Sequence, residues 1–292
     1  MIGRFSKEMF DSRRNRDLRY STLIIGAIFS IFISFYPSQA SGGEVSSSVL
    51  ERSEVTIGVP YCCLPFYYVE GEGEYIDSYG FDVDIARAVA KKIGVEPRFE
   101  PVDSREIIPL VAEGYIQMAP GITHKMGWEM VIDFSVTYFT VGKRILVLDR
   151  SGIKRLRDLR GKKIAATNQS IEKEVLSVIP DARLVFADDM AQAISLLEDR
   201  SVSGVAGEME VLLEFLFSCE NPKRFRLITE SVSKAPRAIG VPPGDSKWKE
   251  LIDFSLIDLY NSGEYMEIFD VWFGNDAPTR LQFGFEMELW PR

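Results

Sequence analysis

The sequence has 292 residues, of which 46% are hydrophobic and 26% are charged, and it contains no repeat or low-complexity tract. This composition excludes disordered and fibrous proteins, and the length favours two lobes over a single core. The formal net charge of −9 disfavours nucleic acid and anionic membranes as partners.

The first 40 residues differ from the rest of the chain and predict a signal peptide for export. Six basic residues precede an apolar run at 21–36, and Ser38 and Ala40 supply the small side chains that a signal peptidase reads. The alternative is an uncleaved membrane anchor, although a spanning helix needs about 20 apolar residues. Cleavage would leave 28 basic and 40 acidic residues, a net charge of −12.

After residue 52 the chain alternates between strand and helix patterns. Apolar, β-rich runs predict strands at 55–59, 98–102 and 116–119, and helical spacing predicts helices over Val83 to Ile93, ended by Gly94, and at 105–113. Strands that alternate with helices form parallel sheets with right-handed crossovers. We therefore expect a parallel sheet in this part of the chain.

The same alternation resumes after an extended stretch at 138–147, which together with 235–241 predicts two crossings between lobes. In this second series we expect strands at 162–166, 183–186, 204–207 and 225–228, and helices at 170–178, 190–199 and 209–217. Two amphipathic helices, 248–260 and 264–273, follow the second crossing.

The predicted fold class is α/β, with two Rossmann-like lobes joined by a two-strand hinge and a ligand cleft between them. The predicted parts are a signal peptide at 1–40, a linker at 41–52, lobe 1 at 53–140 and 236–292, and lobe 2 at 141–235. Ligands of open parallel sheets bind outside the carboxyl ends of strands. In this chain those places are the loop after Val59, the segment after Ala119, and Gly207-Glu208.

Six groups of short motifs in order point to a known family. They are Tyr79-Gly80-Phe81-Asp82-Val83-Asp84, Ile107-Ile108-Pro109, Gly121-Ile122-Thr123, Asp133-Phe134-Ser135, Asp158-Leu159-Arg160-Gly161-Lys162, and Gly263-Glu264-Tyr265 with Trp272-Phe273-Gly274. Over about residues 53–274 the chain resembles the family 3 solute-binding proteins, periplasmic receptors that feed polar amino acids to ABC importers. The resemblance implies the type II periplasmic binding protein fold, a small polar solute and an ABC transporter membrane permease as partners, a monomer, and neither enzymatic activity nor a cofactor.

The resemblance also implies where the solute binds, and several of these positions differ from the family pattern. Trp128 stands where the family usually has a carboxylate-binding arginine, and Cys63 and Ser104 stand where it has aromatic residues. The remaining expected ligand-binding residues are Gly121, Thr123, Thr167, Ser170 and Glu208, of which Glu208 matches the family's acidic residue that takes a ligand amine.

A missing arginine has a large energetic consequence for an amino-acid site. A buried carboxylate without its partner costs on the order of 3 to 5 kcal/mol. Either the solute lacks that carboxylate, or another cation replaces the arginine, and the candidates are Lys125 and Arg105. Trp128 is open to two interpretations, core packing or a stacking wall for the solute. Glu208 is likewise either a ligand for an amine or a solvated carboxylate at a helix N-terminus.

Other polar residues receive structural interpretations. His124 is the only histidine, so a histidine triad or metal site is excluded, and we expect it to face solvent in a loop. Asp82 and Asp84 resemble helix caps and dipole partners more than the paired carboxylates of a glycosidase. Residues 71–74 read as a loop tip rather than a phosphate cradle. Buried thiols are favoured over a disulfide from Cys62 or Cys63 to Cys219.

Two other functions stay open at this point. Some proteins of this shape are cyclohexadienyl dehydratases, but the resemblance implies that they too need the absent arginine. A receptor that senses its solute or assists a partner outside transport is the second alternative, because the sequence has no appended signalling domain but a separate partner could supply one.

Overall fold

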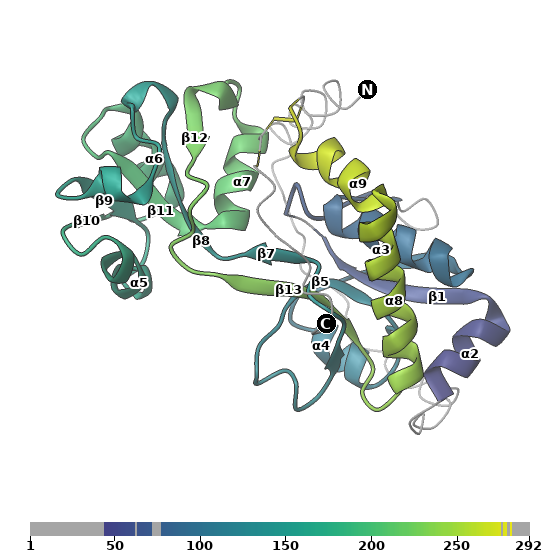
Figure 1. The fold of residues 1–292 in the computed structure, drawn as a ribbon. Helices are drawn as coiled ribbons and strands as arrows, with labels where there is room; N and C mark the ends of the chain where they lie inside the picture. Colours follow the sequence, from purple (N-terminus) through teal and green to yellow (C-terminus); the bar gives the residue numbers. More distant parts are fainter. Residues whose placement is uncertain (1–43, 62, 72–76, 276, 279–280, 282–292) are drawn as a thin grey trace, which may run out of the picture. The chain divides into compact units, whose positions relative to one another are not determined.

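The structure is a computed structural model that describes residues 44–61, 63–71, 77–275, 277–278 and 281. The predicted signal peptide, Cys62 and residues 72–74 of the predicted loop tip lie outside this part. The described chain contains two α/β lobes, lobe 1 and lobe 2, and each is defined by the sheets that it contains (Figure 1). Among the described residues, none of the helices combines the length and the apolar character needed to cross a bilayer.

Lobe 1 contains the strands that precede residue 142 together with one later strand. Its strands are β1 (Glu54–Pro60), β2 (Tyr68–Glu70), β3 (Asp77–Tyr79), β4 (Glu96–Val102), β5 (Ala119–Thr123), β6 (Asp133–Phe134), β7 (Phe139–Val141) and β13 (Ala235–Val241). β1 and β4 are parallel, β2 and β3 form an antiparallel pair, and β13 is antiparallel to β5, β6 and β7. A parallel bridge from Ile57 to Met118 connects β1 to the start of β5.

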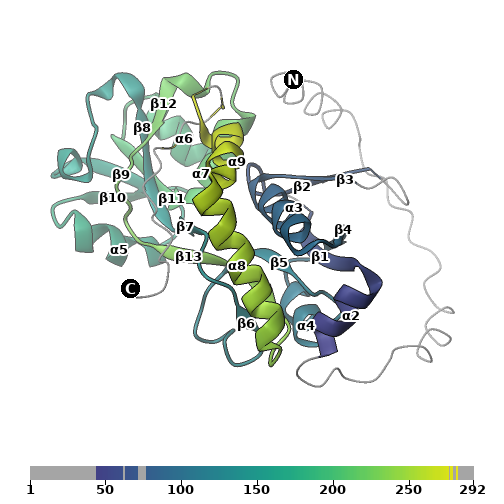
Figure 2. The same cartoon turned by 45° about the vertical axis from the view of Figure 1, so that its right-hand side comes forward.

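The helices of lobe 1 cover this strand system on two sides. They are α2 (Glu44–Arg52), α3 (Phe81–Ile93), α4 (Ile107–Ala112), α8 (Ser246–Ser262) and α9 (Glu264–Phe273). Figure 2 shows α8 and α9 following one another beside α3. The indole Nε1 of Trp272 in α9 donates to Asp84 in α3 at 2.8 Å, which fixes this contact.

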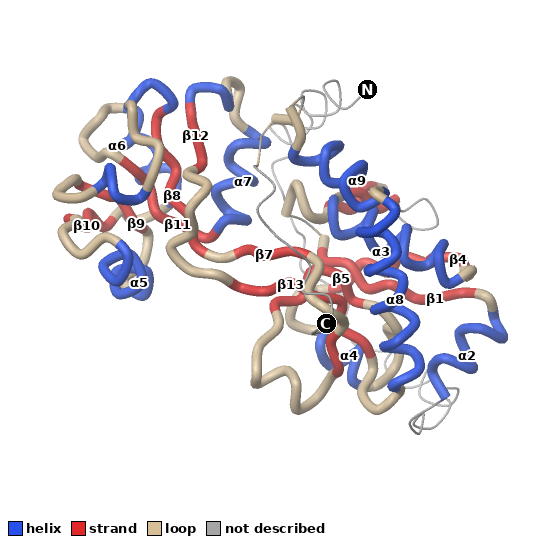
Figure 3. Tube along the Cα trace, in the orientation of Figure 1, coloured by secondary structure: helices blue, strands red, loops and turns tan. Residues whose placement is uncertain are grey.

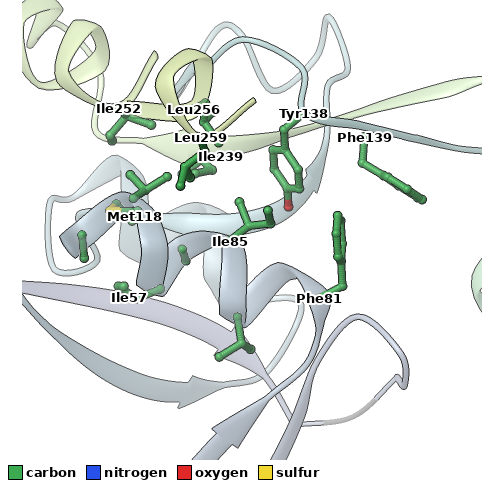
Figure 4. Close-up of a cluster of buried hydrophobic side chains, with 14 of the residues drawn as sticks. Ile57, Phe81, Ile85, Met118, Tyr138, Phe139, Ile239, Ile252, Leu256 and Leu259 are labelled. Carbon is green, nitrogen blue, oxygen red and sulfur yellow. The ribbon is translucent and has the colours of Figure 1, made fainter. Parts of the chain in front are cut away.

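The core of lobe 1 joins residues that are far apart in the sequence. Ile57 in β1, Ile85 in α3, Ile239 in β13 and Leu256 in α8 are all fully buried in one cluster (Figure 4). A second cluster on the other side of the strands contains α4 and Phe134. Burial of a large aliphatic side chain stabilises by about 1.5 to 3 kcal/mol, so these contacts hold the two ends of the described chain together.

Lobe 2 is built on one five-stranded sheet in the order β10-β9-β11-β8-β12. Its strands are β8 (Lys143–Leu148), β9 (Lys163–Ala166), β10 (Arg183–Phe186), β11 (Gly204–Glu208) and β12 (Phe225–Leu227), and its helices are α5 (Ser170–Val178), α6 (Met190–Glu198) and α7 (Met209–Ser218), with 3-10 turns η1 (Asp149–Ser151), η2 (Leu156–Leu159) and η3 (Pro222–Arg224). Ile145 and Val147 of β8 pack with α5, whereas Leu146 packs with α6 and α7. This alternation is the period of a strand covered on both faces.

The two predicted crossings are present as β7 leading into β8, and β13. β7 and β13 pair with each other, and Gly142 separates β7 from β8. Gly142 has a φ of +127°, and a Cβ atom there would lie 2.3 Å from the Ser233 carbonyl oxygen. Only glycine allows this close approach of two backbones.

β8 is antiparallel to β11, and β13 is antiparallel to all its neighbours, because the chain enters lobe 2 at the edge where β9 and β11 end. The sequence patterns predict no direction for these two strands. Two expectations about the fold need correction. The strand expected at 116–119 begins only at Ala119. Most of the predicted linker at 41–52 is helix α2, which Asp245 holds by accepting the Ser46 backbone N–H at 2.7 Å.

Candidate ligand-binding site

The first group of expected site residues lies in β5 and in the connection that follows it. Gly121 has a φ of +80°, and a Cβ atom there would lie 2.4 Å from Asp82 Oδ2. Only glycine allows the backbone to lie this close to the carboxylate. Thr123 ends β5 and pairs in register with Arg237 of β13. The strand therefore delivers Thr123 and the next residues to the point where the chain crosses between lobes.

The connection from β5 to β6 presents apolar side chains to solvent. Figure 3 shows it as a loop, and Trp128 lies in its turn, with the Trp128 backbone N–H donating to the Lys125 carbonyl at 2.8 Å. Trp128 is 40% exposed, so it is only partly covered, and it lies outside the four buried clusters of the described chain.

His124 braces this same loop. Its Nε2 lies 2.6 Å from Glu129 Oε1, and its ring stacks on Phe134 with ring centroids 4.5 Å apart. The residue is half-buried rather than simply solvent-facing, so the expectation for it is only partly right. Its contacts tie the start of the loop to its end.

The residues expected after β1 and β4 lie in exposed turns. Cys63 is half-buried with a φ of +137°, and Ser104 is exposed. The guanidinium of Arg105 donates to both Asp103 oxygens at 2.9 Å, and this pairing lowers the pKa of Asp103 to about 2. Arg105 thus already has a carboxylate partner within its own turn. Lys125, also exposed, has no ion pair among the described residues.

The second group of expected residues gathers at the carboxyl ends of β9 and β11. Thr167 follows β9, and Ser170 begins α5 and donates from its hydroxyl to Asn168 at 2.6 Å. Glu208 ends β11 and is the N-cap residue of α7, without a side-chain capping hydrogen bond. Because β9 and β11 are parallel and paired, these residues share one edge of the sheet.

Sequence reasoning missed Lys143 at this edge. Its Nζ lies 2.8 Å from Glu174 Oε1 and 3.2 Å from Glu208 Oε1, and its side chain is only 16% exposed. Burial disfavours the charged lysine, but the hydrogen bonds that Lys143 donates to the two carboxylates outweigh burial and raise the pKa of Lys143. Lys143 lies opposite Glu208 in the antiparallel pairing of β8 with β11. This neighbour can be identified only once the direction of β8 is known.

A buried charge cluster was also missed, at the crossing itself. Arg237 is 2% exposed and donates from Nη1 to Asp82 Oδ2 at 2.9 Å, while Nη2 makes a very short contact with Glu210 of α7. The Tyr138 hydroxyl donates to Asp82 Oδ1 at 2.7 Å, and the guanidinium lies 4.1 Å from the Phe66 ring centroid. This cluster links strand β13 to a helix of each lobe.

The cluster corrects the interpretation of Asp82 and Asp84 as helix caps. The N-cap of α3 is Gly80, without any side-chain cap, and Asp82 is fully buried. Burial raises the pKa of Asp82 to about 6, against the opposing effects of Arg237 and Tyr138. Asp84 instead pairs with Arg87 at 2.6 Å.

The structure thus places the expected residues in two groups on either side of Arg237. Arg237 pairs in register with Thr123 and reaches Glu210, which lies two residues after Glu208. Trp128 and Glu208 lie on different lobes, and no hydrogen bond joins them within the described part. Among the described residues no cluster of histidine, cysteine, aspartate and glutamate is suited to a metal ion. Cys219 is a half-buried thiol packed against lobe 2.

Comparisons with known proteins agree with this architecture. The model of the bacterial extracellular solute-binding proteins, family 3, matches residues 55–275. The L-glutamate/L-aspartate-binding protein of Pseudomonas aeruginosa is 26% identical over 91% of both chains. A solved ancestral arginine-binding protein bound to glutamine is 31% identical with a TM-score of 0.50, over 77% of this chain and 99% of that one. An ancestral cyclohexadienyl dehydratase, 19% identical over 80% and 98% of the two chains, shares the fold with a TM-score of 0.63. The chain therefore belongs to family 3 of the bacterial extracellular solute-binding proteins.

Proposed function

We propose that this protein captures a small polar solute with a protonated amine, either an amino acid or an amine-like compound, and delivers it to the membrane permease of an ABC importer. The solute would bind in a cleft between the lobes, and binding would favour the closed form. The two relatives named above for glutamate, aspartate, arginine or glutamine support an amino-acid-type solute. We place the protein in the periplasm, as a monomer.

The observation that carries the proposal is the charge balance at Glu208. One lysine, Lys143, stands between Glu174 and Glu208, so the three side chains together carry a single negative charge. Glu208 is 48% exposed on its side chain and can accept a further donor. A protonated amine satisfies both the charge and the hydrogen-bonding capacity of this place.

The other end of the solute meets a weaker set of donors. The hydroxyl of Thr123 suits an anion or a polar group. The hydroxyl of Ser170 and the backbone N–H of Ile171 already donate to Asn168, and the backbone N–H of Glu172 donates to Gln169, so the start of α5 offers a solute less. Lys125 lies in the loop that carries Trp128 and has no ion pair among the described residues, whereas Arg105 is held by Asp103. We assign a carboxylate, when the solute has one, to Lys125 and Thr123, and assign Trp128 to stack on the solute.

A thermal-shift screen tests the proposal. The panel contains glutamate, aspartate, glutamine, arginine, putrescine and phenethylamine, with succinate as a dicarboxylate that lacks an amine. A solute at 100 times its dissociation constant stabilises the folded state by about 2.7 kcal/mol. We expect at least one amine-bearing compound to raise the unfolding temperature, and a shift by succinate alone would contradict the proposal.

Matched variants place the effect at the site. Glu208→Gln and Trp128→Ala should reduce the shift, whereas Glu214→Gln, an exposed carboxylate on the same helix α7, should leave it unchanged. We propose no covalent chemistry for this chain, so incubation with prephenate or arogenate should yield no product. Immobilised protein that retains an ABC permease from solubilised membranes would support transport, and immobilised protein that retains no permease would support a sensing role.

A further inference from the structure

A hollow lies at the edge of the lobe 2 sheet opposite to Thr167 and Glu208. It has a volume of about 750 Å³ and is lined by residues at the end of β8, before β9, at the end of α6 and in η3. Because β8 runs against β11 whereas β9 runs with it, this edge is the one away from Thr167 and Glu208. The hollow is therefore separate from the proposed solute site.

The floor of this hollow is apolar. Ile153, Leu197 and Val202 line it and are at most 6% exposed, so they are fixed in the core of the lobe. Pockets of about 300 to 1,000 Å³ hold small organic molecules. The volume of this hollow and these apolar side chains leave room for the organic part of a ligand, although most of the lining residues are polar or charged.

The rim of the hollow is strongly basic. Five of its lining residues are cationic, namely Arg150, Lys162, Arg200, Lys223 and Arg224, and only Glu198 is acidic. Arg224 pairs with Glu198 at 2.8 Å, while the other four cations have no ion pair within the part of the chain that the structure describes. In a chain with a net charge of −9, this concentration of uncompensated positive charge is local to the hollow.

The end of helix α6 does not cancel this positive charge. A helix C-terminus is negative because its last carbonyl groups lack partners. Here the backbone N–H groups of Asp199 and Arg200 donate to the carbonyls of Ser195 and Leu197 at 2.9 and 3.1 Å, and Val202 donates to Leu196 at 3.2 Å. Arg200 adopts a φ of +60° at this turn, a conformation for which glycine is the usual residue.

From these features we propose that the hollow binds a small organic anion that carries a phosphate group. Several arginine and lysine side chains that line one hollow suit a multiply charged anion, and arginine matches the geometry of phosphate oxygens. Ser151 and Ser203 add hydroxyl donors at the lining. The apolar floor accommodates the organic part. The phosphate belongs to a soluble compound or to a lipid headgroup, and the acidic charge of the whole chain favours the soluble source.

Calorimetry with phenyl phosphate tests this site, with phenol as the uncharged comparison and inorganic phosphate as the comparison without an apolar part. Phenyl phosphate should bind more tightly than either. The double variant Lys162→Gln/Arg200→Gln should weaken its binding at least tenfold, whereas Lys173→Gln, an exposed lysine on α5, should leave it unchanged. Unfolding temperatures of both variants establish that they are folded.

Two further measurements separate the sources and the sites. Co-sedimentation with phosphatidylglycerol vesicles, but not with phosphatidylcholine vesicles, would assign the phosphate to a lipid headgroup, provided that phenyl phosphate displaces the protein. Absence of vesicle binding assigns it to a soluble compound. Glu208→Gln should not affect phenyl phosphate, since the solute site lies at the other edge. Failure of phenyl phosphate to bind, or equal binding to the double variant, would overturn the proposal.

Discussion

Replacement of Asp82 by asparagine removes the buried charge that faces Arg237. In the wild type, Asp82 is fully buried and accepts from Arg237 at 2.9 Å and from the Tyr138 hydroxyl at 2.7 Å. Asparagine keeps an acceptor for the tyrosine but leaves the guanidinium with one carboxylate, Glu210, which is 27% exposed on its side chain. The Arg237 Nε already has no hydrogen-bond partner among the described groups, so the variant adds to an existing deficit.

The expected cost follows from the burial of both partners. Breaking a buried ion pair by removal of one partner destabilises by about 3 to 5 kcal/mol. The acceptor that asparagine retains puts Asp82→Asn at the lower end, at about 3 kcal/mol, and Asp82→Ala at the upper end. In a chain of this size 1 kcal/mol shifts the unfolding temperature by about 2 to 4 °C, so Asp82→Asn should unfold about 6 to 12 °C below the wild type.

Urea unfolding followed by tryptophan fluorescence provides the measurement. Asp84→Asn is the matched control, because Asp84 lies in the same helix turn but keeps 31% side-chain exposure in its pair with Arg87. The control should lose about 1 kcal/mol. A loss of less than 1 kcal/mol for Asp82→Asn, or a loss equal to that of Asp84→Asn, would refute the role given to the buried cluster.

Further predictions concern the solute site, the backbone and the pH dependence. Lys143→Gln removes the positive charge between Glu174 and Glu208, so it should strengthen the binding of putrescine and weaken the binding of glutamate. Each affinity should change about fivefold, the scale of a partly exposed charge pair. Calorimetry that finds the two affinities changed in the same direction would contradict the assigned charge balance. Gly121→Ala should destabilise the protein by more than about 2 kcal/mol, because the new Cβ atom would lie 2.4 Å from Asp82 Oδ2. Gly94 is the control: it has a φ of +86° but open space around it, so Gly94→Ala should cost about 1 kcal/mol. Equal losses in the unfolding temperature of the two variants would refute this prediction. The hydrogen bonds from Arg105 lower the pKa of Asp103 to about 2, so the folded state keeps this carboxylate charged at a pH where the unfolded chain takes up a proton. Arg105→Gln should therefore raise the pKa of Asp103 toward its ordinary value, and an NMR titration that finds the same pKa in both proteins would contradict this pairing.

Local patterns predicted most elements of the fold because their signals lie within a few residues. The helix expected at 264–273 and the strand expected at 183–186 coincide with α9 and β10. Helical spacing and glycine ends define α3, whose Gly94 caps it in a left-handed conformation. The direction of β8 and β13 was not predicted, because strand direction depends on where the chain enters a lobe rather than on local residues.

The site was less predictable, because its charge partners are distant in sequence. Asp82 and Arg237 are separated by 155 residues, and nothing near Asp82 distinguishes a buried acid from an exposed one at a helix start. Lys143 stands in the extended stretch recognised as a crossing, yet its pairing with Glu208 depends on the antiparallel register. The exposure of Trp128, 40% in the folded chain, is likewise not visible in the residues around it.

The central claim is that Glu208 receives the amine of the solute. Its most direct test is calorimetry of the solute found in the thermal-shift screen, with the wild type, Glu208→Gln and Glu214→Gln. A hydrogen bond to a charged group contributes about 1.5 to 3 kcal/mol, so Glu208→Gln should weaken binding roughly 10- to 150-fold while Glu214→Gln matches the wild type. Equal affinity of the wild type and Glu208→Gln would contradict the account.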